Sequence, residues 1–192
     1  MTSLASILRD RDYCCICQPI PEADPGRISH RFIMLSHRFF SDAADVVAYS
    51  LLPDHFHVLL RRNRNSTGSE VEVGYRALLK ELLLYLDTAA AGADTVDTML
   101  QQRTVSPVDL FSIPPVIACL HIDPEKHGIS HDYRGYSFSS YRRYLLHKPA
   151  GLAFDEVFSW FADVEQFVQF HEDIKGIHMQ NKFRRFHSAV PA

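Results

Sequence analysis

The stretch YSLLPDHFHVLLRR, residues 49–62, decides how this chain folds. Residues 45–52 (DVVAYSLL) and 55–61 (HFHVLLR) are apolar runs with the composition of β-strands. Pro53 and Asp54 separate them, and this pair is typical of a turn. The two runs therefore predict an antiparallel β-hairpin.

The second run of the hairpin carries two histidines at a spacing of two. Because side chains alternate along a strand, His55 and His57 are expected to project side by side from one face. Phe56, Val58 and Leu60 then project from the other face, toward the helices. Two imidazoles on an open sheet face provide half of a divalent metal site. Paired histidines on a strand are also common as surface or hydrogen-bonded residues, and that alternative stays open.

Outward from the hairpin, strand-like and helix-like segments alternate along the chain in the order β-α-β-β-α-β-α, followed by a C-terminal helix. This order predicts an α+β fold of the ferredoxin-like kind, with one antiparallel sheet and helices mainly on one face. Besides the hairpin, the predicted elements are strands at 12–18 and 101–110 and helices at 27–40, 71–90, 113–122 and 154–170.

The composition is that of a globular protein. The 192 residues are 46% hydrophobic and 22% charged, which is enough for one domain with a sizeable core. A net charge of -3 argues against binding nucleic acid by bulk charge, although a local basic patch is compatible with it. No apolar run approaches the ~18 residues of a membrane helix, and the first residues, MTSLASILRDRD, are too charged for a secretory signal. We therefore expect a cytoplasmic protein without a membrane partner.

Three of the four cysteines lie close together in the first predicted strand. Cys14, Cys15 and Cys17 are interpreted as small side chains of a buried apolar strand, and Cys119 lies in a predicted helix. A disulfide framework or a zinc site is the alternative. No second CxxC motif is present to supply the other half of a common zinc site.

Four segments, in order, resemble the single-tyrosine HUH transposases, including the REP-associated type. The first is Leu52-Pro-Asp-His-Phe-His57, which matches the HUH signature. The second is Cys119-Leu-His-Ile-Asp-Pro124, where the family carries Ile-His-x-Asn-Pro. The third is Tyr136-Ser-Phe-Ser-Ser-Tyr141, and the fourth is the C-terminal helix from Glu156 to His171. The resemblance covers roughly residues 12–171.

The resemblance implies an enzyme that cuts single-stranded DNA near a hairpin. In the family, a tyrosine attacks the scissile phosphate and becomes linked to the 5′ end. A divalent ion, Mg²⁺ or Mn²⁺, polarises that phosphate. By the resemblance, the metal ligands here are His55, His57 and Asp123, the last replacing the usual asparagine with another oxygen ligand.

The position of the family's nucleophile is occupied by Cys119, one helical turn before Asp123. A thiol is shorter than a phenol by several ångströms, so a phosphate placed for tyrosine lies beyond its reach. We therefore expect strand cleavage to be defective. The alternative is a relocated nucleophile among the downstream tyrosines, such as Tyr141, although Tyr141 belongs to a segment that resembles a packing motif of the family.

Pro124 introduces a local conflict. Proline disfavours the α conformation of the residue before it, so the helix that carries Cys119 is expected to end near Ile122. Asp123 would then lie at the helix end, and its direction relative to the histidines would not be fixed by helical spacing.

The expected DNA contacts are basic residues in a loop beside the histidines, in the third motif and in the tail. They are Arg61, Arg62, Arg64, Arg142, Arg143, Lys182, Arg184 and Arg185. The alternative is that these residues simply belong to a solvated loop and a frayed terminus and do not contact DNA.

Together these features predict a transposase-like protein that binds single-stranded or hairpin DNA. Residues 1–150 form the HUH transposase-like domain, and residues 151–192 form a C-terminal helix and basic tail of the same unit. An active nickase with a downstream tyrosine is one alternative, and an α+β interaction module without DNA or metal is another. A homodimer is compatible with the resemblance, because relatives include both dimers and monomers.

Overall fold

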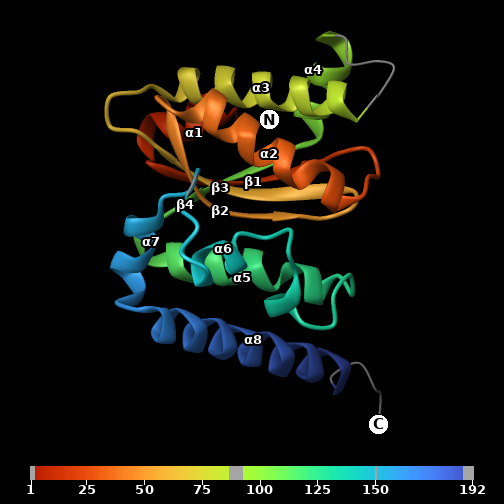
Figure 1. Cartoon of the computed structure of the whole chain (residues 1–192), viewed down its shortest axis with the longest axis vertical. Coiled ribbons are helices and arrows are strands. Elements are labelled where there is room, and N and C mark those ends of the chain that lie inside the picture. Colours follow the sequence, from red (N-terminus) through yellow and green to blue (C-terminus); the bar gives the residue numbers. More distant parts are fainter. Residues whose placement is uncertain (1–2, 87–92, 150, 188–192) are drawn as a thin grey trace.

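The computed structural model describes residues 3–86, 93–149 and 151–187. A four-stranded sheet lies between two layers of helices (Figure 1). In chain order the elements are α1 (Leu4–Asp10), β1 (Tyr13–Pro19), α2 (Pro25–Phe40), β2 (Ala44–Leu51), β3 (His55–Arg62), α3 (Gly68–Tyr85), α4 (Ala93–Gln102), β4 (Thr104–Val108), η1 (Leu110–Ser112), α5 (Ile113–Lys126), η2 (Tyr133–Gly135), α6 (Tyr141–Leu145), α7 (Phe154–Phe161) and α8 (Val164–His187).

The sheet has the strand order β2-β3-β1-β4, and all neighbouring strands are antiparallel. The hairpin predicted from residues 45–61 is the β2–β3 pair. In the pairing of β1 with β3, Cys17 lies opposite His57. The predicted α+β fold class is confirmed.

Helices cover both faces of the sheet, whereas the sequence analysis expected them mainly on one. Figure 1 shows α1, α2 and α3 on one side of the sheet and α5, α6, α7 and α8 on the other. The cause lies in the strands, because Val58, Leu59 and Leu60 are three consecutive buried residues of β3. Val58 and Leu60 belong to the core beneath α2 and α3, while Leu59 belongs to the core beneath α5. A strand that is apolar on both faces needs cover on both.

The outer edge of the sheet is covered by the segment that resembles the family's third motif. The Leu51 N–H donates to Phe138 O and the Ser140 N–H donates to Tyr49 O, both at 3.0 Å. The Tyr144 hydroxyl donates to the carbonyl of Val47, which lies at a bulge in β2. This segment therefore forms hydrogen bonds with backbone groups of the edge strand β2 that would otherwise be unpaired.

Several element boundaries differ from those predicted. Helix α3 starts at Gly68, after a capping box of Thr67 and Glu70, and ends at Tyr85; positions 87–90 of the predicted helix lie outside the described residues. The helix expected over 154–170 is divided into α7 and α8 at Ala162, which has a φ of 57°. The segment expected as a tail continues α8 to His187.

The short helices α1, α4 and α6 were not predicted, and the first two contribute to the core. Helix α1 packs Leu4 and Leu8 into the core beneath α3, and α4 contributes Val96. Both are too short to show a clear helical period in the sequence. Within the described residues, none of the helices combines the length and apolar character that crossing a bilayer requires.

Candidate functional site

The two histidines of the hairpin lie on the sheet face that α5 covers. His55 and His57 are both partly buried, with ring centroids 4.9 Å apart, while Phe56 between them is buried on the opposite face. His55 Nδ1 lies 2.6 Å from Oδ1 of the exposed Asp54. This contact occupies one ring nitrogen of His55 and leaves Nε2 as the other donor, which is how carboxylates commonly orient metal-binding histidines.

Asp123 reaches the histidines from α5. Its Oδ2 lies 3.0 Å from His57 Nε2, so helix and strand are joined across the interior of the site. The expectation that α5 ends near Ile122 is wrong: the helix continues through the buried Pro124 to Lys126. Asp123 therefore keeps its helical position four residues after Cys119, on the same face.

The His57–Asp123 contact is an ion pair in the protein without metal. Burial alone would lower the pKa of His57, but hydrogen bonds with Asp123 and Cys17 raise it to about 9. Burial opposes the ionised form of Asp123 as well, yet the bond to His57 and the nearby Lys126 lower the pKa of Asp123. Imidazolium and carboxylate therefore stabilise each other in a partly buried place.

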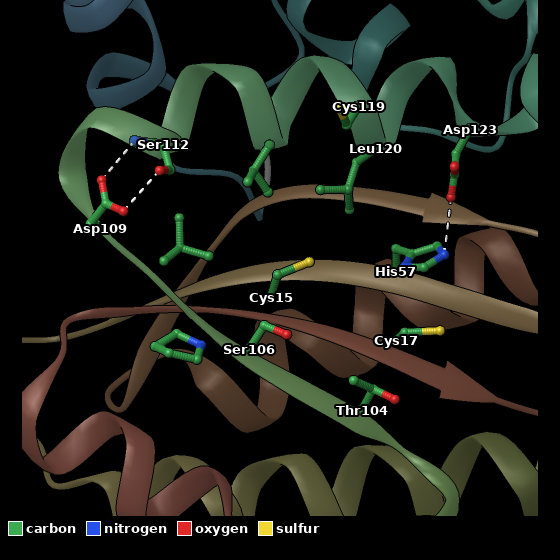
Figure 2. A pocket seen from close by; sticks show the side chains of 13 residues that line it. Cys15, Cys17, His57, Thr104, Ser106, Asp109, Ser112, Cys119, Leu120 and Asp123 are labelled. Atoms are coloured by element: carbon green, nitrogen blue, oxygen red, sulfur yellow. Dashed lines mark hydrogen bonds and ion pairs between the residues drawn. The ribbon is translucent and has the colours of Figure 1, made fainter. Parts of the chain in front are cut away.

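A cleft of about 410 Å³ lies beside this pair, between α5 and the strands β1 and β4. Figure 2 shows Cys15 and Cys17 on the sheet side, with Cys119 on the helix above them and the His57–Asp123 contact at one end. The buried Cys14 points to the opposite core, as strand alternation requires. The interpretation of Cys15 and Cys17 as mere core residues is therefore incomplete, and none of the four cysteines forms a disulfide.

Cys119, which the sequence resemblance places at the position of the family's tyrosine, lines this cleft. Burial raises the pKa of its thiol, with only a partial opposing effect of the Lys126 charge. The thiol is therefore protonated at neutral pH and is a weak nucleophile. Its short side chain does not offer the reach of a phenol.

All eight tyrosines belong to the described residues, and none of them lines the cleft. Tyr85 lies on α3, across the sheet. Tyr49 and Tyr141 are buried. The other hydroxyls donate hydrogen bonds to groups outside the cleft: Tyr13 to Glu156, Tyr75 to Gln18, Tyr133 to Glu172, Tyr136 to Leu51 and Tyr144 to Val47.

Tyr141, named as a possible substitute nucleophile, is fully buried in the aromatic layer between α5 and α8. Its ring stacks on Phe167 with centroids 5.5 Å apart and contacts Tyr133 at 5.0 Å. Burial raises the pKa of its hydroxyl. The side chain therefore packs the core and has no access to a strand of DNA in this arrangement.

His121, which matches a histidine of the family's second motif, is also buried and belongs to a hydrogen-bond chain. His171 Nδ1 donates to Phe167 O at 2.7 Å, which leaves its Nε2 to accept from His121 Nδ1 at 2.8 Å. His121 Nε2 then accepts from the Ser140 hydroxyl at 2.7 Å. Burial lowers the pKa of both histidines, that of His171 to about 4. Two neutral rings thus tie α5, α6 and α8 together.

Arg61 and Arg62 were expected to lie beside the histidines, but in the structure they lie away from them. They end β3, about 20 Å along the strand from His55 at ~3.3 Å per residue. Arg61 pairs with Asp45 and Glu156, and Arg62 pairs with Asp12 at 2.7 Å. Both charges are therefore largely compensated within the protein.

The other basic residues belong to three separate parts of the chain. Arg64 is exposed after β3, and Arg142 is exposed on α6, where it donates to Ser137. Arg143, on the same helix, is partly buried. The backbone of Lys182, Arg184 and Arg185 belongs to α8, and their side chains lie outside the described part.

Sequence reasoning missed two candidate metal ligands at the site. Cys17 lies with His55 and His57 in a group whose donor atoms are all within 4.8 Å of one another. His127 forms a second such group with His55 and Asp123, nearer the surface. The alternation of β1 could have placed Cys17 on this face, but its pairing with His57 follows from the register of β1 and β3, which the sequence does not show.

The donors fit a divalent ion, but not one of the hard kind. Mg²⁺ and Mn²⁺ prefer carboxylate, carbonyl and water oxygens, whereas this site offers imidazole nitrogens, a thiol and one carboxylate. The donor atoms therefore support binding of a divalent ion, but they support the expected Mg²⁺ or Mn²⁺ less well than a softer divalent ion.

No protein-family model matches the chain, and no curated protein matches it. A solved structure similar to it is a REP-associated tyrosine transposase bound to a REP hairpin. The TM-score is 0.54 with 12% sequence identity, over 73% of this chain and 84% of that chain. At this identity the likeness concerns the fold alone: the chain shares the fold of that structure over the matched part.

Proposed function

We propose that this protein is a transposase-like DNA-binding protein that recognises hairpin or single-stranded DNA without cutting it. The observation that carries the proposal is the cleft beside His57 and Asp123, in which Cys119 stands where a tyrosine nucleophile belongs. The arrangement retains the binding elements of a strand-cutting site while the attacking group is missing.

The fold supports the binding half of this proposal. The similar solved structure holds a DNA hairpin. In this chain His57 lines a cleft, and His55, partly buried, lies beside it. A divalent ion held by the histidines would neutralise charge on a phosphate oxygen when bound.

The loss of cleavage follows from chemistry and reach. The Cys119 thiol is protonated by burial, and no tyrosine hydroxyl among the described residues lines the cleft. An active nickase that uses Tyr141 requires a buried ring to leave its packing against Phe167. Exposing that ring would cost most of its burial free energy, about 2–3 kcal/mol for an aromatic side chain, before any attack.

Exposed groups around the cleft provide the contacts for DNA. Lys126, exposed in the last turn of α5, is close enough to influence the pKa of Cys119 and Asp123. Phe111 in η1, next to the cleft residue Ser112, is 94% exposed and offers a face for an unpaired base. Of the basic residues expected from the sequence, Arg64 and Arg142 are the exposed ones among the described side chains.

The test measures DNA binding by fluorescence anisotropy with labelled hairpins that carry single-stranded flanks, single strands and blunt duplexes. Wild-type protein should bind the hairpins and single strands more tightly than the duplexes, and affinity should fall as salt rises because phosphate contacts release counterions. Lys126→Gln should weaken binding and lower the salt slope by about one. Lys80→Gln, an exposed lysine on α3 across the sheet, is the matched control and should bind like wild type.

Failure to bind any structured oligonucleotide at low salt would contradict the proposal and favour an interaction module. Equal weakening by Lys126→Gln and Lys80→Gln would show non-specific attraction instead of a site at the cleft.

A further inference from the structure

Three side chains with nitrogen and sulfur donors meet at one end of the cleft. The donor atoms of Cys17, His55 and His57 all lie within 4.8 Å of one another. Cys17 and His57 are direct cross-strand partners in β1 and β3. The group is partly buried, so its donors are reachable from the cleft while its backbone is held by the centre of the sheet.

We propose that Cys17, His55 and His57 form a zinc site in which the Cys17 thiolate is a ligand. Thiolate and imidazole are the ligands that Zn²⁺ prefers in proteins, and they are poor ligands for Mg²⁺ and Mn²⁺. With Zn–N and Zn–S bonds of about 2.0–2.3 Å, tetrahedral donors stand about 3.5 Å apart. Since the three donors already lie within 4.8 Å of one another, they need to approach by no more than about 1.3 Å, a change of the size that side-chain rotation gives.

The surrounding groups prepare these donors. Asp54 holds Nδ1 of His55, so the ring is oriented and Nε2 is left for the ion. Asp123 Oδ2 lies 3.0 Å from His57 Nε2 and is the carboxylate available for the fourth position. On binding, Cys17 releases its thiol proton to solvent and its sulfur becomes an anionic ligand.

The outer group of His55, Asp123 and His127 competes for the same ring of His55. The His127 side chain is 47% exposed, and its Nε2 lies 3.9 Å from Asp123 Oδ1. Recruiting it requires an exposed side chain to be ordered at the end of a helix. The inner group lies instead on two paired strands and contains the thiolate, so zinc is assigned to it.

The proposal is independent of DNA binding, and its test contains no DNA. Reduced protein is freed of metal and titrated with Co²⁺, a spectroscopic substitute for Zn²⁺. A thiolate ligand produces a sulfur-to-cobalt charge-transfer band in the near ultraviolet, whereas a site with only nitrogen and oxygen ligands does not. The wild-type complex should show this band at one equivalent of cobalt and lose it when Zn²⁺ is added.

The variants then identify the sulfur. Cys17→Ser should remove the charge-transfer band and weaken Zn²⁺ binding by more than about 100-fold, in competition with a chromophoric chelator. Cys15→Ser is the matched control, because Cys15 lies two residues earlier on the same face of β1 and lines the same cleft. It should keep both the band and the affinity, and so should His127→Ala.

A wild-type cobalt complex without the band would overturn the proposal, and this measurement uses the unsubstituted protein, so no effect of a substitution on folding enters it. Binding that survives Cys17→Ser but is lost in His127→Ala would assign the ion to the outer group. Absence of zinc binding in a protein that still binds hairpin DNA would reject the zinc site alone.

Discussion

His57 on β3 and Asp123 on α5 form an ion pair, with 3.0 Å between Nε2 and Oδ2, that joins the sheet to the helix covering it. Their side chains are 20% and 17% exposed, so water screens the contact only in part. The pair also fixes the direction of the helix face that carries Cys119, because that residue lies one turn earlier. The contact is thus both a structural tie and one wall of the cleft.

The first prediction concerns the strength of this tie. In protein kept metal-free by a chelator, a double-mutant cycle of His57→Gln and Asp123→Asn should give a coupling free energy of about 1–3 kcal/mol, because the two charges are partly removed from water. Urea unfolding at pH 6.5 measures it. Arg76 and Asp97, 49% and 45% exposed, are the control pair and should couple by less than about 0.5 kcal/mol. Equal coupling in the two cycles would contradict a partly buried ion pair.

The second prediction is a loss of stability in acid that originates in the His121–His171 chain. Burial lowers the pKa of His171 to about 4, below the ~6.5 of an unfolded histidine, although the nearby Glu172 opposes this shift. Because the unfolded state takes up the proton first, stability is present above pH 6.5 and is lost as pH falls toward 4. The loss from His171 alone should reach about 3 kcal/mol at pH 4.

His171→Gln tests the second prediction. Glutamine can still accept from His121 Nδ1 but does not titrate, so this variant should be less stable at pH 7 and lose less stability between pH 7 and 4. Urea unfolding at several pH values measures how the free energy of unfolding changes with pH in wild type and in the variant. Parallel curves for wild type and variant would place the acid sensitivity elsewhere.

The sequence predicted those features that local patterns decide. The turn at Pro53 and Asp54 and the alternation of His55 and Phe56 follow from neighbouring residues, and the structure has both. The prediction about Pro124 was wrong because tertiary contacts overcame a local preference: Pro124 is buried, and Asp123 gains a partner in His57 by remaining helical.

Other features depend on how distant segments meet. Cys17 joins the site through the register of β1 against β3, and it lies 38 positions before His55 in the chain, so no short motif contains them both. The second helical layer also follows from tertiary packing, since Leu59 needs cover on the face opposite Val58. A period-two pattern would have indicated one open face, but β3 is apolar on both.

The third prediction is that purified wild-type protein neither nicks end-labelled hairpin DNA nor forms a covalent adduct with Mg²⁺, Mn²⁺ or Zn²⁺. The Cys119 thiol is short and protonated, and the tyrosine hydroxyls lie outside the cleft. Denaturing gels of wild type, Cys119→Ser and Tyr141→Phe should be indistinguishable. An adduct that survives Cys119→Ser and disappears in one tyrosine-to-phenylalanine variant would show a relocated nucleophile.

Cys119→Tyr extends this comparison, because Cys119 points into an open cleft of about 410 Å³ rather than into a packed core. The larger side chain should therefore fold with less than about 1 kcal/mol of destabilisation, in contrast to the 1–3 kcal/mol typical of overpacking. Thermal unfolding measures this. A larger loss would mean that the helix face has closed around the thiol.

The fourth prediction assigns base stacking to Phe111. Its ring is 94% exposed in η1, so Phe111→Ala should leave thermal stability unchanged. Stacking of an unpaired base on an aromatic ring contributes about 1–3 kcal/mol, and the substitution should therefore weaken hairpin binding by roughly 5- to 150-fold. Leu84→Ala on α3 is the control, since Leu84 is 50% exposed and lies across the sheet. Anisotropy titrations with hairpins that carry or lack single-stranded flanks measure the effect. The loss should be confined to the flanked hairpins, because only they supply an unpaired base, and equal losses for both would assign Phe111 to another role.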